Sequence, residues 1–306
     1  MQEKYRRHKR GSTKVTVAGR VQEELKVQLL YDKRIRKYDV FVMVTLLPRR
    51  LGFNVSNQVH TKLSSPHTTR MAGSSASTRR TIFSVPSTTL PIANSAEVYP
   101  IRRIYCVGRN YTDHTKEMGG NPDREVPFFF SKPRDAVTSA KRIPYPPATA
   151  NLHYEMELVV ALGAGGSYVP IQSAMDLVYG YAAGVDLTRR DLQAQAKDLG
   201  RPWDASKGFD QSAPIGLIHP RDAVEEDSLH EWDMTLRVNG IEKQRCKLGQ
   251  MIWSVPETIF ILSTLFRLEA GDLIFTGTPS GVGPLEKEDK VEGIVSGLTP
   301  VLFQVT

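Results

Sequence analysis

Residues 152–160, with the sequence LHYEMELVV, are the stretch that most constrains the fold of this chain. Apolar side chains recur at every second position, which predicts a β-strand with one face packed into a core. His153, Glu155 and Glu157 would share the opposite face, with the two carboxylates roughly 6–7 Å apart by strand rise. A solvated outer face would also carry such a pair, but Val159 and Ala161 continue the same face with apolar side chains. We therefore expect a partly enclosed acidic site.

Basic residues are concentrated near the start of the chain. Residues 1–70 contain 16 Lys and Arg against 5 Asp and Glu, whereas residues 71–306 contain 24 against 28. The Ser- and Thr-rich stretch at 63–80 and the weak periodicity around it are typical of disorder. We expect a basic, disordered extension over residues 1–95 and a folded domain over residues 96–306. The extension could be an organelle-targeting segment, a nucleic-acid-binding arm or a segment with no folding role, and Met71 could be the start.

Composition narrows the class of protein. The chain is 40% hydrophobic and 24% charged, as in globular proteins, and the apolar run at 40–47 is too short to span a bilayer. Cys106 and Cys246 are too few for a disulfide scaffold and indicate reduced intracellular thiols. We expect a cytoplasmic protein, or a mitochondrial one if the extension is a transit segment. Nucleic-acid binding is disfavoured, because the basic run YRRHKR lacks interleaved aromatic residues or a DNA-binding motif.

A short helix after the predicted strand at 101–107 carries a second candidate group. His114 and Glu117 are three residues apart, which places them on one helix face. A carboxylate beside an imidazole orients it and raises its basicity, as a general base acting on water requires. An exposed helix with an ordinary ion pair would show the same spacing. Gly119-Gly120 and the following NPDREVP predict a mobile loop or lid next to this helix.

Asp186 follows the predicted strand at 179–185 and precedes a predicted helix that ends at Leu199, for which Thr188 and Asp191 would be a capping pair. A further helix is predicted at 170–179. In the polar and aromatic loop at 201–210, Lys207 is the candidate cation, although an exposed lysine lying over an aromatic ring would fit equally.

Several established motifs are missing from the sequence. The glycine-rich segments fit neither a dinucleotide fingerprint nor a Walker sequence, and no G-x-S-x-G or H-E-x-x-H motif occurs. Three carboxylates without cysteine form a hard-oxygen site, which suits Mg²⁺, Mn²⁺ or Ca²⁺ better than Zn²⁺.

Ordered motifs across residues 97–306 resemble the fumarylacetoacetate hydrolase family. They are GRNY before His114 and Glu117, the EME strand, GxDLTRRDLQ, GRPWDxxK and GDLIFTGTPxGVG. The resemblance implies an α+β fold, a mixed β-roll or β-sandwich with flanking helices, and a homodimer. It implies that Mg²⁺ or Mn²⁺ is held by Glu155, Glu157 and Asp186, and that His114, oriented by Glu117, activates water. It further implies that Lys207 and Thr278 lie beside the substrate, with Arg109, Arg190 and Gln193 as second-tier contacts. We also expect Arg124, in the predicted lid, to meet a distal carboxylate of the substrate.

Within the family, the segment from GRNY to FFFSKP is most similar to the fumarylpyruvate hydrolases of gentisate breakdown. This similarity implies hydrolysis of a carbon–carbon bond in a 3-acylpyruvate, a 2,4-dioxo acid, with fumarate and pyruvate as products. Related reactions in the family are acylpyruvate hydrolysis, oxaloacetate decarboxylation, and isomerisation or hydration of dienoates. A nucleic-acid-binding protein that uses the basic extension is the alternative from another class.

Overall fold

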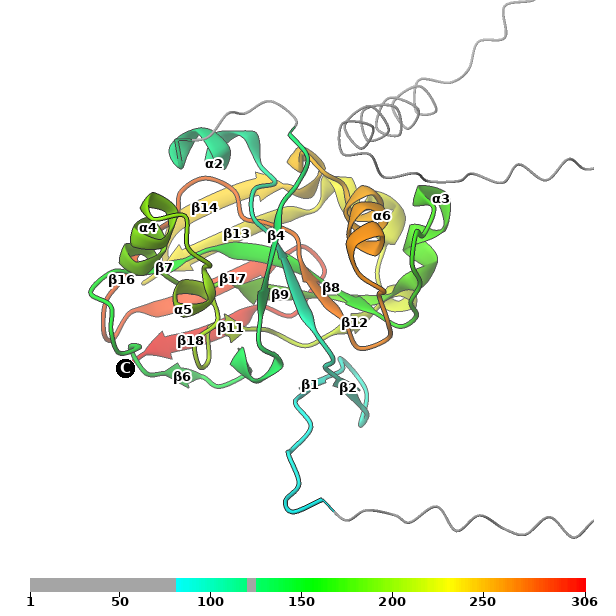
Figure 1. The fold of residues 1–306 in the computed structure, drawn as a ribbon, viewed down its shortest axis with the longest axis horizontal. Helices are drawn as coiled ribbons and strands as arrows, with labels where there is room; N and C mark the ends of the chain where they lie inside the picture. Colours follow the sequence, from blue (N-terminus) through cyan, green and yellow to red (C-terminus); the bar gives the residue numbers. More distant parts are fainter. Residues whose placement is uncertain (1–80, 120–124) are drawn as a thin grey trace, which may run out of the picture. The chain divides into compact units, whose positions relative to one another are not determined.

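The computed structural model describes residues 81–119 and 125–306, which form strands and helices in mixed sheets (Figure 1). The six-stranded sheet, in the order β12-β9-β8-β15-β3-β4, comprises His219–Pro220, Val178–Val185, Met156–Leu162, Leu273–Phe275, Ile104–Val107 and Phe129–Lys132. The five-stranded sheet, in the order β14-β13-β17-β18-β6, comprises Ile241–Lys247, Asp233–Val238, Lys290–Val295, Val301–Val305 and Arg142–Ile143. Strand β15 pairs parallel with β3 and antiparallel with β8. The predicted α+β class with mixed sheets is confirmed.

Smaller sheets and five helices complete the described residues. A three-stranded sheet has the order β10-β7-β16, with bounds Thr188–Arg189, Leu152–Tyr154 and Gly283–Leu285. Two-stranded pairs are β1-β2, at Thr89–Pro91 and Val98–Pro100, and β11-β5, at Ala213–Pro214 and Val137–Thr138. The helices are α2 (Thr112–Glu117), α3 (Ile171–Ala174), α4 (Arg190–Asp198), α5 (Asp204–Lys207) and α6 (Val255–Leu265). None of the helices in these ranges combines the length and hydropathy that a membrane span requires.

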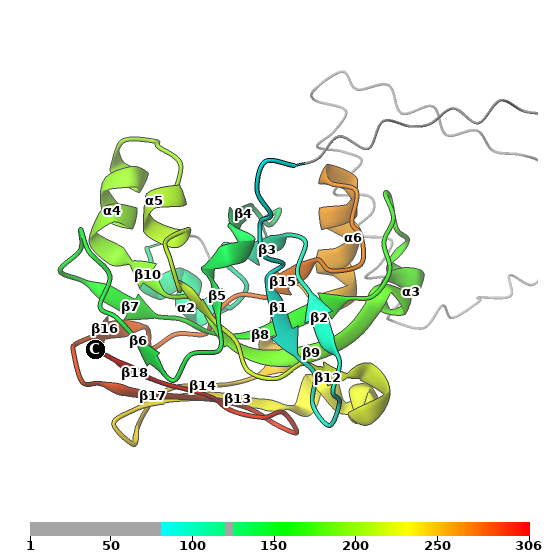
Figure 2. The ribbon, with the colours of Figure 1, turned by 90° about the horizontal axis from the view of Figure 1, so that it is seen from below.

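Two packed layers explain why β8 is apolar on both faces. Figure 2 shows the five-stranded sheet stacked against β8 and β9, with α4 and α5 at one end and α3 and α6 at the other. Leu158 and Val160 belong to the core between the two sheets, and Val159 and Ala161 belong to a second core on the opposite face. Every residue of β8 is consequently buried. The apolar continuation that predicted an enclosed face is therefore explained by the second core.

The alternating pattern predicted a single strand for the acidic stretch, and this prediction is wrong. Strand β7 ends at Tyr154, β8 begins at Met156, and Glu155 lies in the break between them. The two strands belong to different sheets, since β7 pairs with β10 and β16 whereas β8 pairs with β9 and β15. The break places Glu155 where the three-stranded sheet meets the six-stranded sheet.

Other local predictions have mixed outcomes. Asn239-Gly240, a dipeptide typical of two-residue hairpin turns, joins β13 to β14 with φ of 53° and 79°, and a capping box of Ser254 and Glu257 opens α6. The helix predicted at 170–179 is shorter, because α3 ends at Ala174 and β9 starts at Val178. The capping pair proposed for α4 is wrong, since Thr188 lies in β10 and Arg189 occupies the N-cap position.

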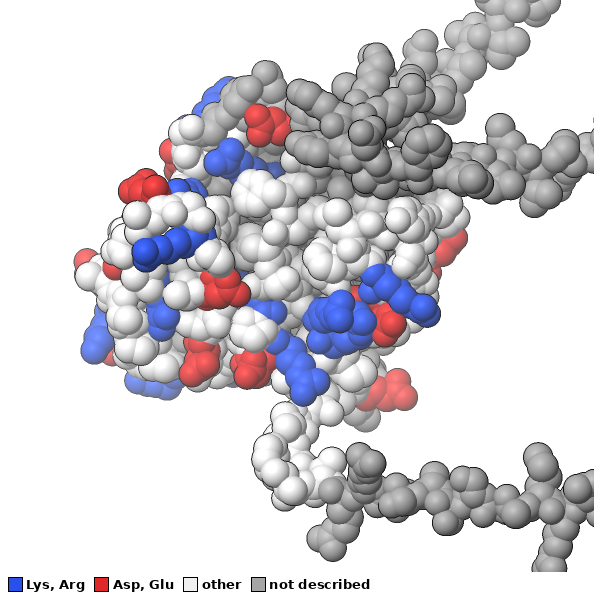
Figure 3. Space-filling model, in the orientation of Figure 1, with Lys and Arg blue, Asp and Glu red and all other residues white. Residues whose placement is uncertain are grey.

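The folded part begins before the predicted boundary at residue 95. Leu90 in β1 is buried, and β1 pairs antiparallel with β2. The predicted disorder of the extension falls mainly on residues 1–80, which lie outside the described residues, as does Met71. On the face drawn in Figure 3, basic and acidic side chains are interspersed, in keeping with the nearly balanced charge of residues 71–306.

Candidate active site

Three carboxylates converge where β7, β8 and β9 meet. Glu155 lies in the β7–β8 break, Glu157 in β8 and Asp186 directly after β9, and one ligand oxygen of each lies within 4.8 Å of the others. All three are buried, so the alternative of a solvated strand face is wrong. Antiparallel pairing of Met156 with Val185 sets this geometry, and the Asp186 N–H donates to the Glu155 carbonyl at 2.8 Å.

Two buried lysines neutralise part of this acidic group. The Lys207 ammonium lies 2.7 Å from Glu155 Oε2, Asp186 Oδ2 and Thr188 Oγ1. Lys207 ends α5 and is 2% exposed, which excludes an exposed lysine lying over an aromatic ring. Burial lowers the pKa of Lys207, but Asp186 and Glu155 outweigh burial and raise it, so the side chain stays charged. Lys132 in β4 approaches Asp186 from the other side, with 2.7 Å between Nζ and Oδ1.

Glu157 is the carboxylate that lacks a cationic partner among the described residues. Its Oε2 accepts a hydrogen bond from Gly277 N at 2.6 Å, from the glycine-containing loop after β15. Burial and then the charges of Asp186 and Glu155 raise its pKa well above the usual range. The pKa of Glu155 is instead lowered, because the positive charges of Lys207 and Arg190 outweigh the effect of burial. Glu157 is thus the one carboxylate of the three whose charge no cation contacts among the described residues.

These residues fit a divalent cation. The donors are three buried carboxylates, the ligand type that Mg²⁺ and Mn²⁺ prefer. Asp186 Oδ1 is buried and accepts no hydrogen bond, although Lys132 Nζ lies within ion-pair distance, so this oxygen retains an unused lone pair. A bound cation would supply both the missing charge at Glu157 and a partner for that lone pair.

His114 and Glu117 lie together on α2, as their spacing predicted. His114 Nδ1 lies 3.1 Å from Glu117 Oε2, and the imidazole is buried rather than exposed. Gly281 N donates to both Glu117 oxygens, at 3.2 and 3.3 Å, so the carboxylate bridges the histidine and the loop after β15. Burial lowers the pKa of His114 despite the opposing charges of Glu155 and Glu117. A neutral ring that donates from Nδ1 leaves Nε2 free to accept a proton.

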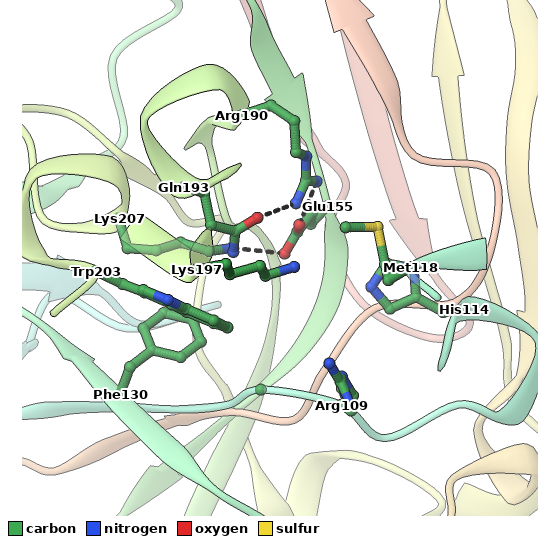
Figure 4. Close-up of a pocket in the computed structure, with 11 residues that line it drawn as sticks. Arg109, His114, Met118, Phe130, Glu155, Arg190, Gln193, Lys197, Trp203 and Lys207 are labelled. Atoms are coloured by element: carbon green, nitrogen blue, oxygen red, sulfur yellow. Dashed lines mark hydrogen bonds and ion pairs between the residues drawn. The ribbon is translucent and has the colours of Figure 1, made fainter. Parts of the chain in front are cut away.

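The pocket in front of Glu155 brings most of the predicted residues together (Figure 4). Arg190 on α4 donates to Glu155 Oε1, and its other guanidinium nitrogen donates to Gln193 Oε1 at 2.6 Å. Figure 4 shows their side chains, that of Lys207 and those of His114 and Arg109 around one cavity. The complete lining is Gly108, Arg109, His114, Met118, Phe130, Glu155, Arg190, Gln193, Lys197, Trp203 and Lys207.

Two predicted contacts are not among the described lining residues. Thr278 is buried, and its hydroxyl accepts a hydrogen bond from Gln244 Nε2 at 2.9 Å. Arg124 lies outside the described residues. The roles of all these side chains toward a substrate remain predictions.

Three contributors were missed from the sequence. Gln244 is buried, and its side-chain oxygen accepts a hydrogen bond from Met156 N at 2.9 Å while its nitrogen donates to Thr278 Oγ1. Gln244 therefore links Met156, which lies between the two glutamates, to the loop that contains Thr278. Its inward position follows the two-residue period of β14. Lys197 follows Arg190 and Gln193 at i+7 and i+4, a spacing that could have placed all three on one face of α4. Lys132 is the third contributor, since its ammonium lies 2.7 Å from Asp186 Oδ1.

Comparisons with known proteins agree with this architecture. The model of the fumarylacetoacetate hydrolase C-terminal domain matches residues 103–306. A fumarylpyruvate hydrolase of Ralstonia sp is 44% identical over 191 residues, which cover 61% of this chain and 98% of that protein. The mitochondrial oxaloacetate tautomerase FAHD1 of Mus musculus is 40% identical over 205 residues, which cover 67% of this chain and 91% of that protein. The crystal structure of fumarylpyruvate hydrolase from Pseudomonas aeruginosa, in complex with Mn²⁺ and pyruvate, matches with a TM-score of 0.72 at 45% identity, covering 74% of this chain and 99% of that one.

Proposed function

This chain belongs to the fumarylacetoacetate hydrolase family, and we propose that it hydrolyses a carbon–carbon bond of a 3-acylpyruvate, with fumarylpyruvate as the preferred substrate. Fumarate and pyruvate would be the products, as a step in the breakdown of aromatic compounds. The observation that carries the proposal is the buried trio of carboxylates beside a neutral, carboxylate-oriented histidine in one pocket. Both relatives named as fumarylpyruvate hydrolases support the choice of substrate.

Glu155, Glu157 and Asp186 would hold Mg²⁺ or Mn²⁺, which when bound supplies Lewis acidity at the 2-oxo-acid end of the substrate. His114 accepts a proton from water through Nε2, while Glu117 holds the Nδ1 proton and stabilises the imidazolium that forms. The water then attacks the distal carbonyl carbon, and the bond to C3 of the pyruvate unit breaks. Its electron pair stays on the pyruvate unit as an enolate, which becomes pyruvate when C3 takes up a proton equivalent to the one that His114 removed from water. Lys207 contributes fixed positive charge where negative charge develops on the leaving pyruvate unit.

Arg190, Gln193, Arg109 and Thr278 are proposed as substrate contacts of this site. For Arg190 the support is geometric, because it already joins Glu155 to Gln193 beside the pocket. We further propose a homodimer acting in the cytoplasm. A mitochondrial location is the alternative, and the mitochondrial FAHD1 relative supports it.

The test is a spectrophotometric assay of the purified chain with fumarylpyruvate and acetylpyruvate, with Mg²⁺, with Mn²⁺ and with chelator. We expect metal-dependent loss of the dioxo-acid absorbance with stoichiometric pyruvate. His114→Ala should lower kcat by about 10²- to 10⁴-fold, the usual contribution of a general base. Absence of turnover by the metal-loaded chain on both substrates would refute the proposal.

Oxaloacetate is a second candidate substrate, since the FAHD1 relative is named as an oxaloacetate tautomerase. Decarboxylation of oxaloacetate requires no water-activating base, whereas hydrolysis does. If His114→Ala abolishes turnover of fumarylpyruvate but preserves carbon dioxide release from oxaloacetate, the pocket supports both reactions. If the wild-type chain consumes oxaloacetate alone, the second candidate replaces the first.

A further inference from the structure

Four cationic side chains line the pocket, but they differ in their partners. Arg190 and Lys207 are paired with Glu155, next to the carboxylate trio. Arg109 and Lys197 line the same pocket and make no ion pair with the described residues. Positive charge that faces a cavity without a carboxylate partner attracts an anion. The pocket therefore contains two cations paired with Glu155 and two cations without a carboxylate partner among the described residues.

Aromatic rings contact the two cations that have no ion-pair partner among the described residues. The Arg109 guanidinium lies 5.7 Å from the Phe128 ring centroid, and the Lys197 ammonium lies 5.4 Å from that of Trp203. The two rings contact each other edge to face at 5.5 Å, so one aromatic cluster supports both cations. Gly108 permits this arrangement, since a Cβ there would lie 2.0 Å from the Phe128 ring.

The two cations reach the cavity from different elements. Arg109 precedes α2, and Lys197 lies in the last turn of α4. Figure 4 shows both side chains extending toward the space between His114 and Trp203. Burial, and then the positive charges of Arg190 and Arg109, lower the pKa of Lys197, which agrees with a local excess of positive charge. His114 and Glu155 line the same pocket as these two cations.

We propose that Lys197 and Arg109 form a subsite for the distal carboxylate of a dicarboxylic 2,4-dioxo acid. The inference rests on the proposed function, in which the 2-oxo-acid end occupies the carboxylate trio. A substrate with a carboxylate at each end would then place one carboxylate near the trio and the other at Lys197 and Arg109, with its scissile bond near His114. The subsite selects fumarylpyruvate over acetylpyruvate, which has no second carboxylate.

Steady-state kinetics on both substrates test the subsite. Lys197→Met preserves most of the side-chain volume over Trp203 and removes the charge, whereas Lys197→Arg retains the charge. For Lys197→Met we expect KM for fumarylpyruvate to rise about tenfold, the value of one charge-assisted hydrogen bond, with acetylpyruvate unchanged. Lys197→Arg should restore most of the affinity. The matched control is Lys287→Met at an exposed lysine away from the pocket, which should leave both constants unchanged.

Ligand binding separates failure of the subsite from failure of the proposed function. In the Mg²⁺-loaded protein, calorimetry should show fumarate binding about tenfold more weakly to Lys197→Met, with oxalate binding unchanged. If wild-type protein turns over neither substrate but shows this difference for fumarate, the proposed function fails and the subsite stands. The subsite is overturned if Lys197→Met shifts both substrates equally or neither. It is also overturned if only Arg124→Ala changes the ratio of the two KM values, because the distal carboxylate would then belong to the loop at 120–124.

Discussion

Replacing Glu157 by glutamine should stabilise the metal-free protein and weaken its response to metal. Glu157 is 2% exposed and has no cationic partner among the described residues, while Glu155 and Asp186 lie within 4.8 Å of it. Glutamine has nearly the same shape, and its side-chain oxygen can still accept the hydrogen bond from Gly277 N. The substitution therefore removes a charge and little else.

The size of the effect follows from the geometry. At an effective dielectric constant of about 20, two like charges at this separation repel by about 3 kcal/mol. Lys207 offsets part of the repulsion through its contacts with both neighbours. We expect a net gain of about 2 kcal/mol in the free energy of unfolding, which corresponds to a Tm higher by about 4–8 °C for a domain of this size.

The gain should depend on pH in a defined direction. The pKa of Glu157 is raised in the folded protein above its ordinary value of 4.5. The contribution of Glu157 to the free energy of unfolding of the wild type is therefore lost as the pH rises from 4.5 through the folded-state pKa. Glutamine removes this loss, so the two proteins should be equally stable below pH 4.5 and diverge above it.

Thermal unfolding with chelator and with Mg²⁺ or Mn²⁺, from pH 4 to 8, measures both effects. Metal at a hundredfold excess over its dissociation constant should stabilise the wild type by about 2.7 kcal/mol, and Glu157→Gln should lose most of that. Glu286→Gln, at an exposed position, is the control for loss of a negative charge. If metal-free Glu157→Gln is less stable than wild type at pH 8, the assignment of Glu157 as the uncompensated charge is wrong.

Three further predictions concern the residues around the trio. Glu117→Gln should shift the acidic limb of the kcat/KM profile to lower pH, because the Glu117 charge and hydrogen bond raise the His114 pKa; an unchanged limb would exclude His114 as the base. Gln244→Leu should lower the free energy of unfolding by about 2–3 kcal/mol in urea, since it leaves Met156 N unpaired in the core. Lys132→Met should lower the free energy of unfolding of the metal-free protein by about 3–5 kcal/mol, because the buried Asp186 Oδ1 loses its ion-pair partner. If added metal does not reduce this loss, a cation near Asp186 is excluded.

Local pattern was sufficient to predict most of the acidic site. Apolar alternation around Glu155 and Glu157, and the position of Asp186 at a strand end, correctly indicated side chains that meet in an enclosed place. The i, i+3 spacing correctly paired His114 with Glu117. These features depend on the periodicity of one strand or one helix, which the sequence encodes directly.

The remainder depends on contacts between distant segments. The break at Glu155 leaves the alternating pattern intact, since the apolar residues at every second position on both sides of it pack into one core. The break arises because β7 and β8 pair with strands of different sheets, and no local pattern encodes those pairings. Similarly, the contacts of Lys132 and Gln244 join residues 54 and 88 positions apart, between Lys132 and Asp186 and between Gln244 and Met156.

The break at Glu155 has a consequence for the order in which the protein folds. Glu155 lies in the break between two sheets and Glu157 lies in β8, and their partners Lys207 and Gly277 lie 52 and 120 residues further along the chain. Contacts of such large sequence separation form late, because closing long loops costs entropy before any contact compensates for it. The cation site of the folding chain is therefore incomplete until the sheets that contain β7 and β8 have docked. Metal binding would then measure the fraction of chains that have finished folding.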